Sequence, residues 1–179
     1  GSIGGNIATA SPIGDTLPIL LSLNAEIIIQ SKNKKINIPI KKFFTAYRKT
    51  KLKKGEFIYS IKIPIYKKNI FKAYKISKRF DDDISSICAS FNLEIINKKI
   101  KKIMIAYGGM AEIPKRATNC ENMLNNKALT LINFENAKKY LEKDFKPIDD
   151  MRATKDYRIE VAKNLLIKCF LEIKSNKII

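Results

Sequence analysis

Six short apolar runs follow one another between residues 26 and 107, separated by turns and loops rather than by long helices. They are rich in β-branched residues, as strands are, and several alternate apolar with polar positions, which predicts one buried face. The runs cover residues 26–30, 35–40, 57–63, 71–76, 84–96 and 100–107. Strands that follow one another without crossover helices pair antiparallel. The sequence therefore predicts an α+β fold, a mainly antiparallel sheet with flanking helices.

Helical patterns gather in the last third of the chain, after Pro114. They predict helices over residues 116–124, 133–143 with Asn133 as the cap, and 154–173 with Thr154 as the cap. The last helix carries an apolar stripe at helical spacing: Tyr157, Val161, Leu165 and Cys169, with Ala162, Leu166, Phe170 and Ile173 beside it. One or two further helical turns are expected at residues 41–47. A soft boundary near residues 66–69 divides the chain into domains of residues 1–66 and 67–179.

Positive charge dominates the composition. The chain has 35 Lys and Arg against 17 Asp and Glu, for a formal net charge of +18 in 179 residues. Such a balance suggests a polyanionic partner or an acidic subunit surface. The lysines are scattered through every segment, however, so a solvated coat is the default interpretation. A basic module that binds nucleic acid or an acidic partner stays open as the alternative.

Cysteine and histidine usage excludes several chemistries. The three cysteines are far apart in the sequence and histidine is absent, which argues against a disulfide framework, a zinc site or an iron–sulfur cluster on this chain. Proton-shuttling hydrolysis by histidine is excluded as well. We therefore predict no catalytic residue and no metal site. Because no apolar stretch reaches the length of a membrane span and no signal-peptide pattern is present, we expect a soluble, cytoplasmic protein.

The run from Gly4 to Asp15 predicts a glycine-rich turn that leads into a helix. Paired glycines permit positive φ and a close approach of backbone to a ligand. Ser11 is a suitable N-cap and Pro12 a suitable first helical residue, so the free amides there would attract an anion. A carboxylate repels phosphate. Asp15 therefore either accepts hydrogen bonds from the ribose, ribityl or adenine groups of a nucleotide or offsets the helix dipole as a first-turn acid. An ordinary tight turn is the alternative for the whole run.

Further blocks extend this pattern along the chain, in residues 43–50 with 55–58, 75–84, 107–111 with 114–117, and 150–153 with 157–158. Taken together and in this order, they resemble the FAD-binding subunit of molybdenum hydroxylases, above all xanthine dehydrogenase and also the medium subunit of carbon monoxide dehydrogenase. The resemblance covers the whole chain. It implies that residues 1–66 are the later part of a PCMH-type FAD-binding domain and that residues 67–179 are the C-terminal α+β domain of the flavin subunit.

The resemblance also assigns cofactor-binding residues. The residues matched to the FAD diphosphate are Ser2, Ile3, Gly4, Gly5 and Asn6; Thr9 and Ser11 would add hydroxyl donors; Asp15 would hydrogen-bond FAD; Phe57 and Ile58 would pack against the flavin; and Lys75 would lie near the flavin ring. By pattern alone Phe57 and Ile58 are strand core, Phe57 more so than Ile58, and Lys75 is a solvated lysine, as a lone lysine on a strand usually is.

The partners implied by the resemblance lie outside this chain. The family's upstream half, with another phosphate loop and an aromatic residue that covers the flavin, has no counterpart here. Molybdopterin and 2Fe-2S centres are expected on partner chains. Electrons from the iron–sulfur centres are expected to pass through FAD to NAD. No membrane or nucleic-acid partner is expected. A docking domain without cofactor is a further alternative.

Three other features have an ordinary interpretation beside the functional one. Arg79 with Asp81–Asp83 either gates the flavin or forms a loop held by its own ion pairs. Gly108 and Gly109 shape a turn rather than bind a ligand. Arg152 and Arg158 either grip a neighbouring segment or subunit or remain on a helix surface.

Overall fold

The structure, a computed structural model, describes residues 1–79 and 83–175. Its helices are α1 (Ile3–Thr9), α2 (Thr16–Ser22), the 3-10 turn η1 (Ile40–Lys42), α3 (Thr118–Leu124), α4 (Leu131–Lys138), α5 (Leu141–Asp144) and α6 (Lys155–Ser175). Its strands are β1 (Glu26–Gln30), β2 (Lys35–Pro39), β3 (Phe44–Ala46), β4 (Lys49–Thr50), β5 (Phe57–Lys62), β6 (Ile70–Ile76), β7 (Ile87–Ile96), β8 (Lys99–Gly108) and β9 (Lys115–Arg116). The strand pairs are antiparallel throughout this part of the chain, which confirms the predicted fold class.

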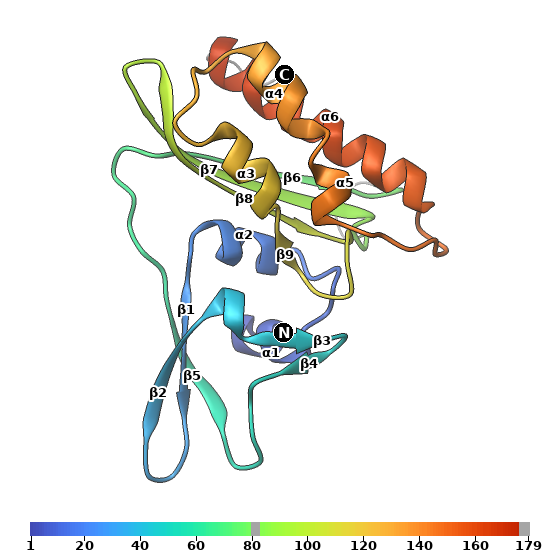
Figure 1. Cartoon of the computed structure of the whole chain (residues 1–179). Coiled ribbons are helices and arrows are strands. Elements are labelled where there is room, and N and C mark those ends of the chain that lie inside the picture. Colours follow the sequence, from blue (N-terminus) through green and yellow to red (C-terminus); the bar gives the residue numbers. More distant parts are fainter. Residues whose placement is uncertain (80–82, 176–179) are drawn as a thin grey trace.

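The larger layer is a four-stranded sheet in the order β6-β7-β8-β9. Helices α3 to α6 cover one of its faces and α2 packs on the other (Figure 1). The β7–β8 hairpin turns at Asn97 and Lys98, which both have positive φ, 51° and 60°, as the two central residues of a type I′ turn do. Because both faces of the sheet are covered, β7 and β8 are buried along most of their length.

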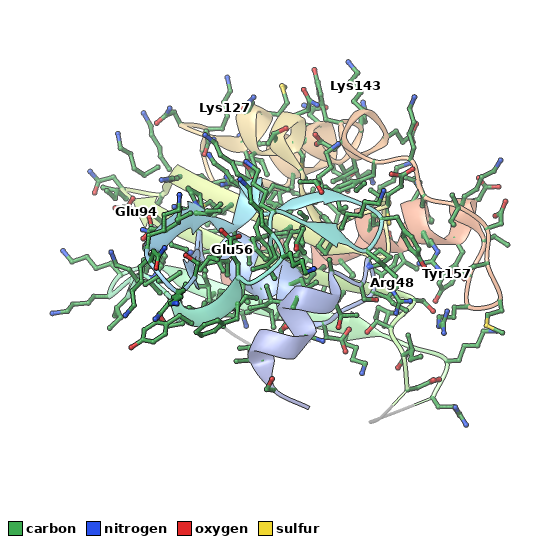
Figure 2. The ribbon with its side chains drawn as sticks, turned by 90° about the horizontal axis from the view of Figure 1, so that it is seen from below. Arg48, Glu56, Glu94, Lys127, Lys143 and Tyr157 are labelled. Carbon is green, nitrogen blue, oxygen red and sulfur yellow. The ribbon has the colours of Figure 1, made fainter. Side chains whose placement is uncertain are left out.

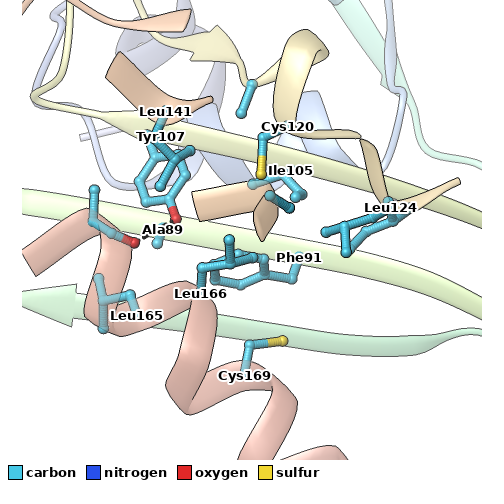
Figure 3. Packing of buried hydrophobic residues seen from close by; sticks show 14 of the residues in the cluster. Ala89, Phe91, Ile105, Tyr107, Cys120, Leu124, Leu141, Leu165, Leu166 and Cys169 are labelled. Atoms are coloured by element: carbon cyan, nitrogen blue, oxygen red, sulfur yellow. Dashed lines mark hydrogen bonds between the residues drawn. The ribbon is translucent and has the colours of Figure 1, made fainter. Parts of the chain in front are cut away.

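The main core lies between this sheet and the C-terminal helices (Figure 3). Phe91 and Tyr107 project from the sheet toward apolar side chains of α6, and the two rings meet edge to face with centroids 5.9 Å apart. The Tyr107 hydroxyl is fully buried but donates to the Ala162 carbonyl at 2.9 Å. This bond ties the middle of the sheet to α6 and removes the cost of an unpaired buried hydroxyl.

The smaller layer is the three-stranded sheet β2-β1-β5, with the short β3–β4 hairpin beside it. Its apolar face encloses a second core with α1 and α2, in which Ile7, Leu17, Ile27 and Phe43 are fully buried. Helix α2 touches both layers, because it also packs on β7 and β8. The N-terminal segment is thereby fixed against the C-terminal sheet.

Surface lysines point away from both layers. Figure 2 shows Lys127 and Lys143 extending outward from the helical layer, and both are exposed. This arrangement fits a solvated coat. Within the described ranges, no helix combines the length and apolar character that a membrane crossing requires.

The predicted glycine-rich turn is instead the helix α1. Ser2 is its N-cap and Ala10, with a left-handed φ of 49°, ends it. The glycines with positive φ among the described residues are Gly55 and Gly109, not Gly4 or Gly5. The next helix begins at Thr16 rather than at Pro12. The reason is a tertiary contact, because the Pro12 carbonyl accepts the Gly109 amide at 2.8 Å and so remains outside a helix.

Three other local predictions were wrong in part. Residues 41–47 are the short turn η1 followed by strand β3. The helix predicted at 133–143 is divided into α4 and α5, and α4 begins with Thr130 as N-cap rather than Asn133, whose amide donates to the Ala128 carbonyl at 2.7 Å. The Thr154 cap of α6 is confirmed, since its Oγ1 accepts the Tyr157 amide at 3.2 Å. Tyr157 itself is 48% exposed, because Arg158 takes the inward position of that turn.

Candidate functional site

Helix α1 carries the glycine pair at the N-terminal edge of the smaller layer. The Ser2 Oγ accepts the Gly5 amide at 3.1 Å, and the Thr9 hydroxyl donates to the Gly5 carbonyl at 2.9 Å. A Cβ built on Gly4 would meet no atom within 4 Å. Ser2, Gly5 and Thr9 are exposed, and the first turn holds no acidic residue. The surface of α1 is therefore open backbone with hydroxyl groups and no negative charge.

Asn6 joins α1 to the start of α2. The Thr16 hydroxyl donates to Asn6 Oδ1 at 2.5 Å, which leaves the Asn6 amide group for another acceptor. Ile3 is 51% exposed on the same helix. Ser11 differs from the other predicted hydroxyl donors, because its Oγ accepts the Ile13 amide at 3.4 Å inside the following loop.

Asp15 and Lys75 meet although 60 residues separate them in the sequence. Lys75 Nζ lies 3.1 Å from Asp15 Oδ2, and both side chains are about one third exposed, 36% and 37%. The Ser85 hydroxyl donates to the other carboxylate oxygen, Asp15 Oδ1. Cys88, the residue paired with Lys75 across β6 and β7, lies 3.4 Å from the Asp15 carbonyl. The carboxylate is thus held at the surface by one cation and one hydroxyl, and part of it remains open to a ligand.

Local electrostatics keep the Cys88 thiol protonated. Burial raises the pKa of this thiol to about 12, the negative charge of Asp15 contributes to the rise, and Lys75 opposes it. A thiol with so high a pKa is inert as a nucleophile near neutral pH. Cys88 therefore contributes to packing at this site.

Strand β5 brings the two predicted apolar contacts next to α1. Phe57 and Ile58 lie on opposite faces, because side chains alternate along a strand. Ile58 is paired with Ile29 and packs against the second core, whereas Phe57 is 53% exposed. The exposed apolar side chain at this place is therefore Phe57, although the pattern alone favoured it as core more than Ile58.

The donor set of this region suits a dinucleotide such as FAD. The exposed start of α1 and the Ser2 hydroxyl, which accepts a bond but keeps its own proton to donate, suit the acceptor oxygens of a diphosphate, and the open space at Gly4 leaves room for one. The Asp15 carboxylate can accept from hydroxyl groups, and the Lys75 ammonium can donate to a ring oxygen. In the described residues, no cluster of three or more His, Cys, Asp or Glu side chains is placed to hold a metal ion.

Sequence reasoning missed Ser85 and Ser86 and left Arg158 open. The two serines are almost fully buried at the start of β7, and Ser85 contacts Asp15 directly. Arg158 is 1% exposed and donates to the carbonyls of Ser86 and Gly109, so it does grip neighbouring segments. Arg79 pairs with Asp83 at 3.4 Å, while Asp81 and Asp82 lie outside the described residues.

Two family models match this chain, one after the other. Residues 1–66 match the FAD binding domain in molybdopterin dehydrogenase, and residues 72–173 match the CO dehydrogenase flavoprotein C-terminal domain. The chain belongs to this family, that of the FAD-binding subunits of molybdenum hydroxylases, as the sequence blocks predicted. The cofactor of the family is FAD. These matches do not favour the alternative of a basic nucleic-acid module.

Individual relatives agree with the family models. Xanthine dehydrogenase of Emericella nidulans is 36% identical over 145 residues, which are 79% of this chain and 11% of that protein. The glyceraldehyde dehydrogenase medium chain of Sulfolobus acidocaldarius is 31% identical over 176 residues, 97% of this chain and 61% of that one. These relatives are oxidoreductases or subunits of them.

Solved structures share the fold. A chain of the carbon monoxide dehydrogenase from Hydrogenophaga pseudoflava superposes with a TM-score of 0.89 at 23% identity, covering 93% of this chain and 58% of that chain. The quinoline 2-oxidoreductase of Pseudomonas putida superposes with a TM-score of 0.87 at 20% identity, covering all of this chain and 62% of that one. The chain thus spans less than two thirds of each of these relatives.

Proposed function

We propose that this chain forms one wall of the FAD site in a xanthine dehydrogenase-like molybdenum hydroxylase and takes part in electron transfer to NAD. The observation that carries the proposal is the contact between Asp15 and Lys75. Each residue was assigned to FAD separately, from a different block of the sequence, and the two side chains lie 3.1 Å apart. Charged groups that belong to one ligand site are expected to converge in this way.

Each part of the site has a task in this proposal. The backbone of Gly4 and Gly5 lies against the diphosphate, and at Gly4 a larger side chain would occupy the open space that the diphosphate needs. Asp15 accepts hydrogen bonds from FAD hydroxyls, and Lys75 favours negative charge on the nearby ring. Phe57 excludes water from the apolar side of the ligand. The flavin supplies the redox chemistry, while these residues bind and orient it.

The remaining predicted contacts belong to the same wall. Ser2, Ile3, Asn6 and Thr9 surround the glycine pair on α1, and Ser11 shapes the loop that leads to Asp15. The backbone of Ile58 contributes from β5. All of these are proposals of binding and positioning, and we assign no catalytic side chain to this chain.

The wider assembly is also a proposal. Residues 1–66 would complete the FAD domain together with an upstream half, and residues 67–179 would form the second domain; two separate hydrophobic cores support this division. Molybdopterin and 2Fe-2S centres would reside on other parts of the complex. A cytoplasmic location is supported by three buried cysteines, all of them free thiols.

Visible absorbance of the complex purified through this chain tests the function. We expect a yellow complex whose flavin is released as FAD. A colourless complex, fully assembled, would refute the FAD proposal and favour a docking domain without cofactor. This chain by itself is expected to bind FAD weakly, and co-expression with the upstream half should restore binding. Tight FAD binding by the isolated chain in a fluorescence-quenching titration would contradict the requirement for that half.

A further inference from the structure

Arg158 is a buried cation that bonds to two separate turns. It is 1% exposed, its Nη1 donates to the Ser86 carbonyl and, at 2.9 Å, to the Gly109 carbonyl, and its Nη2 donates to Asp150 Oδ1 at 2.7 Å. In the described part of the chain, its Nε has no partner. A guanidinium can serve three acceptors in one plane, which an ammonium or an apolar side chain cannot do.

The glycine opposite this guanidinium permits the close approach. Gly109 has a φ of 81°, and a Cβ built on it would lie 2.8 Å from Arg158 Nη1. That is closer than a real Cβ allows. The backbone of this turn and the side chain of α6 are therefore fitted to each other.

The first of the two turns holds the hydroxyl partner of Asp15. Ser86 follows Ser85, whose hydroxyl donates to Asp15 Oδ1. The Ser86 amide also donates to the Ile76 carbonyl at 2.8 Å, next to Lys75 on β6. By holding the Ser86 carbonyl, Arg158 fixes the segment before β7 that carries Ser85, and the bond from the Ser86 amide joins this segment to the end of β6 beside Lys75.

The second turn holds the backbone ahead of Asp15. The Gly109 amide donates to the Pro12 carbonyl at 2.8 Å, three residues before Asp15. The Gly109 carbonyl is held in turn by Arg158. One guanidinium thus fixes both the segment that carries Asp15 and the segment that carries Ser85, the hydroxyl donor to Asp15.

From this geometry we infer that Arg158 is a positioning residue for the Asp15–Lys75 pair, and through that pair for FAD. The inference rests on the proposed function of Asp15. A buried cation costs folding free energy unless it is well paired, and here one donor is unpaired. An apolar side chain would fill the same space at a lower cost in folding free energy, but it could not hold the carbonyls of Ser86 and Gly109 and the carboxylate of Asp150 in place.

The test compares Arg158→Met with Arg116→Met in the complex purified through this chain. Arg116 is a matched control, because it makes a two-bond pair with Glu121 at 2.6 and 2.8 Å in the same core, and its side chain is 17% exposed. We expect roughly a tenfold rise in the FAD dissociation constant for Arg158→Met, equivalent to the loss of about one hydrogen bond. We expect Arg116→Met to lower stability while leaving FAD affinity and the visible spectrum of the bound flavin unchanged.

A double mutant separates positioning from general stability. If Arg158 acts through Asp15, Arg158→Met adds little to the loss of FAD affinity already caused by Asp15→Ala. Additive losses overturn the inference, as do equal losses in the Arg116 control. Should Arg158→Met fail to fold, Arg158→Lys replaces it, since the ammonium retains the charge but cannot reach all three acceptors. Unchanged FAD affinity in Asp15→Ala refutes the proposed function and the inference with it. If Asp15→Ala lowers FAD affinity but neither Arg158→Met nor Arg158→Lys does, the inference about Arg158 is refuted and the proposed function is retained.

Discussion

Replacing Asp15 by alanine should weaken FAD binding by somewhat more free energy than it costs the fold. The ion pair with Lys75 is about one third exposed, and pairs of that kind contribute about 0.2–1 kcal/mol. Loss of the hydrogen bond from the Ser85 hydroxyl costs about 1 kcal/mol more, because Ser85 is only 1% exposed and its hydroxyl would be left buried without a partner. The total loss of stability is therefore about 1–2 kcal/mol. A hydrogen bond from the ligand to a carboxylate is worth about 1.5–3 kcal/mol, so the FAD dissociation constant should rise roughly 10- to 150-fold.

Glu26 offers a matched control within the smaller layer. Its carboxylate also has one ion pair, with Lys62 at 3.4 Å, and one side-chain hydrogen bond, from Asn37 at 2.9 Å. FAD release from the complex is followed by the rise in flavin fluorescence, and stability is measured by urea unfolding. Glu26→Ala should leave FAD affinity unchanged. If Asp15→Ala weakens FAD binding no more than Glu26→Ala does, the assignment of Asp15 to the site is wrong.

Three further outcomes follow from the contacts. Asp144→Ala should lower the free energy of unfolding by about 2–4 kcal/mol in urea titrations, since the buried carboxylate accepts the amides of Asn119 and Cys120 at 2.9 and 3.0 Å and the buried Cys120 amide would be left without its acceptor. The Cys88 thiol, with a pKa of about 12, should resist iodoacetamide at pH 8 until the chain unfolds; rapid labelling of the folded protein would contradict its burial. Burial alone would raise the pKa of Asp150, but two backbone amides and the adjacent guanidinium outweigh it, so the pKa lies below 3.8. The stability gained from this lowered pKa is present above the unfolded value and lost as pH falls through the folded one, so the cost of Asp150→Asn should shrink below about pH 4; a constant difference from pH 7 to pH 3 would refute it.

The fold class could be predicted because the relevant signals are local. The β-branched run in β1, the alternating residues of β5 and the short turn at Asn97 determine strand and hairpin formation over a few residues. The stripe on α6 is equally local, and Leu165 and Cys169 are buried as predicted. Where a pattern reflects one face of one element, the structure agrees with it at most positions, with exceptions such as Tyr157 on α6 and Phe57 on β5, which are exposed.

The mistaken predictions share a different cause, which is a partner distant in the sequence. Pro12 has the chemistry of a first helical residue, but its carbonyl is bonded to Gly109, 97 positions away. Arg158, for which the sequence left two interpretations open, is also decided by distant partners, because its guanidinium donates to two backbone carbonyls from other turns. A hydrogen bond to a backbone carbonyl cannot be predicted from residue types, because every residue has such a carbonyl. The helix at Gly4 and Gly5 is an exception to this cause, because the nearby Ser2 cap and the burial of Ile7 favour α1.

The site predicted from the sequence depends on both matched segments at once. Asp15 lies in the segment matched to the FAD-binding domain, whereas Lys75 and Ser85, which hold its carboxylate, lie in the segment matched to the C-terminal domain. In the proposed site the two segments therefore share one ligand wall. If Asp15 contacts FAD as proposed, a substitution in the C-terminal segment should lower FAD affinity without contacting FAD, because Lys75 and Ser85 orient the Asp15 carboxylate. Asp15 is the N-cap residue of α2, the helix that packs on both layers, so loosening the contact between the layers should weaken binding of the proposed cofactor before it unfolds either core.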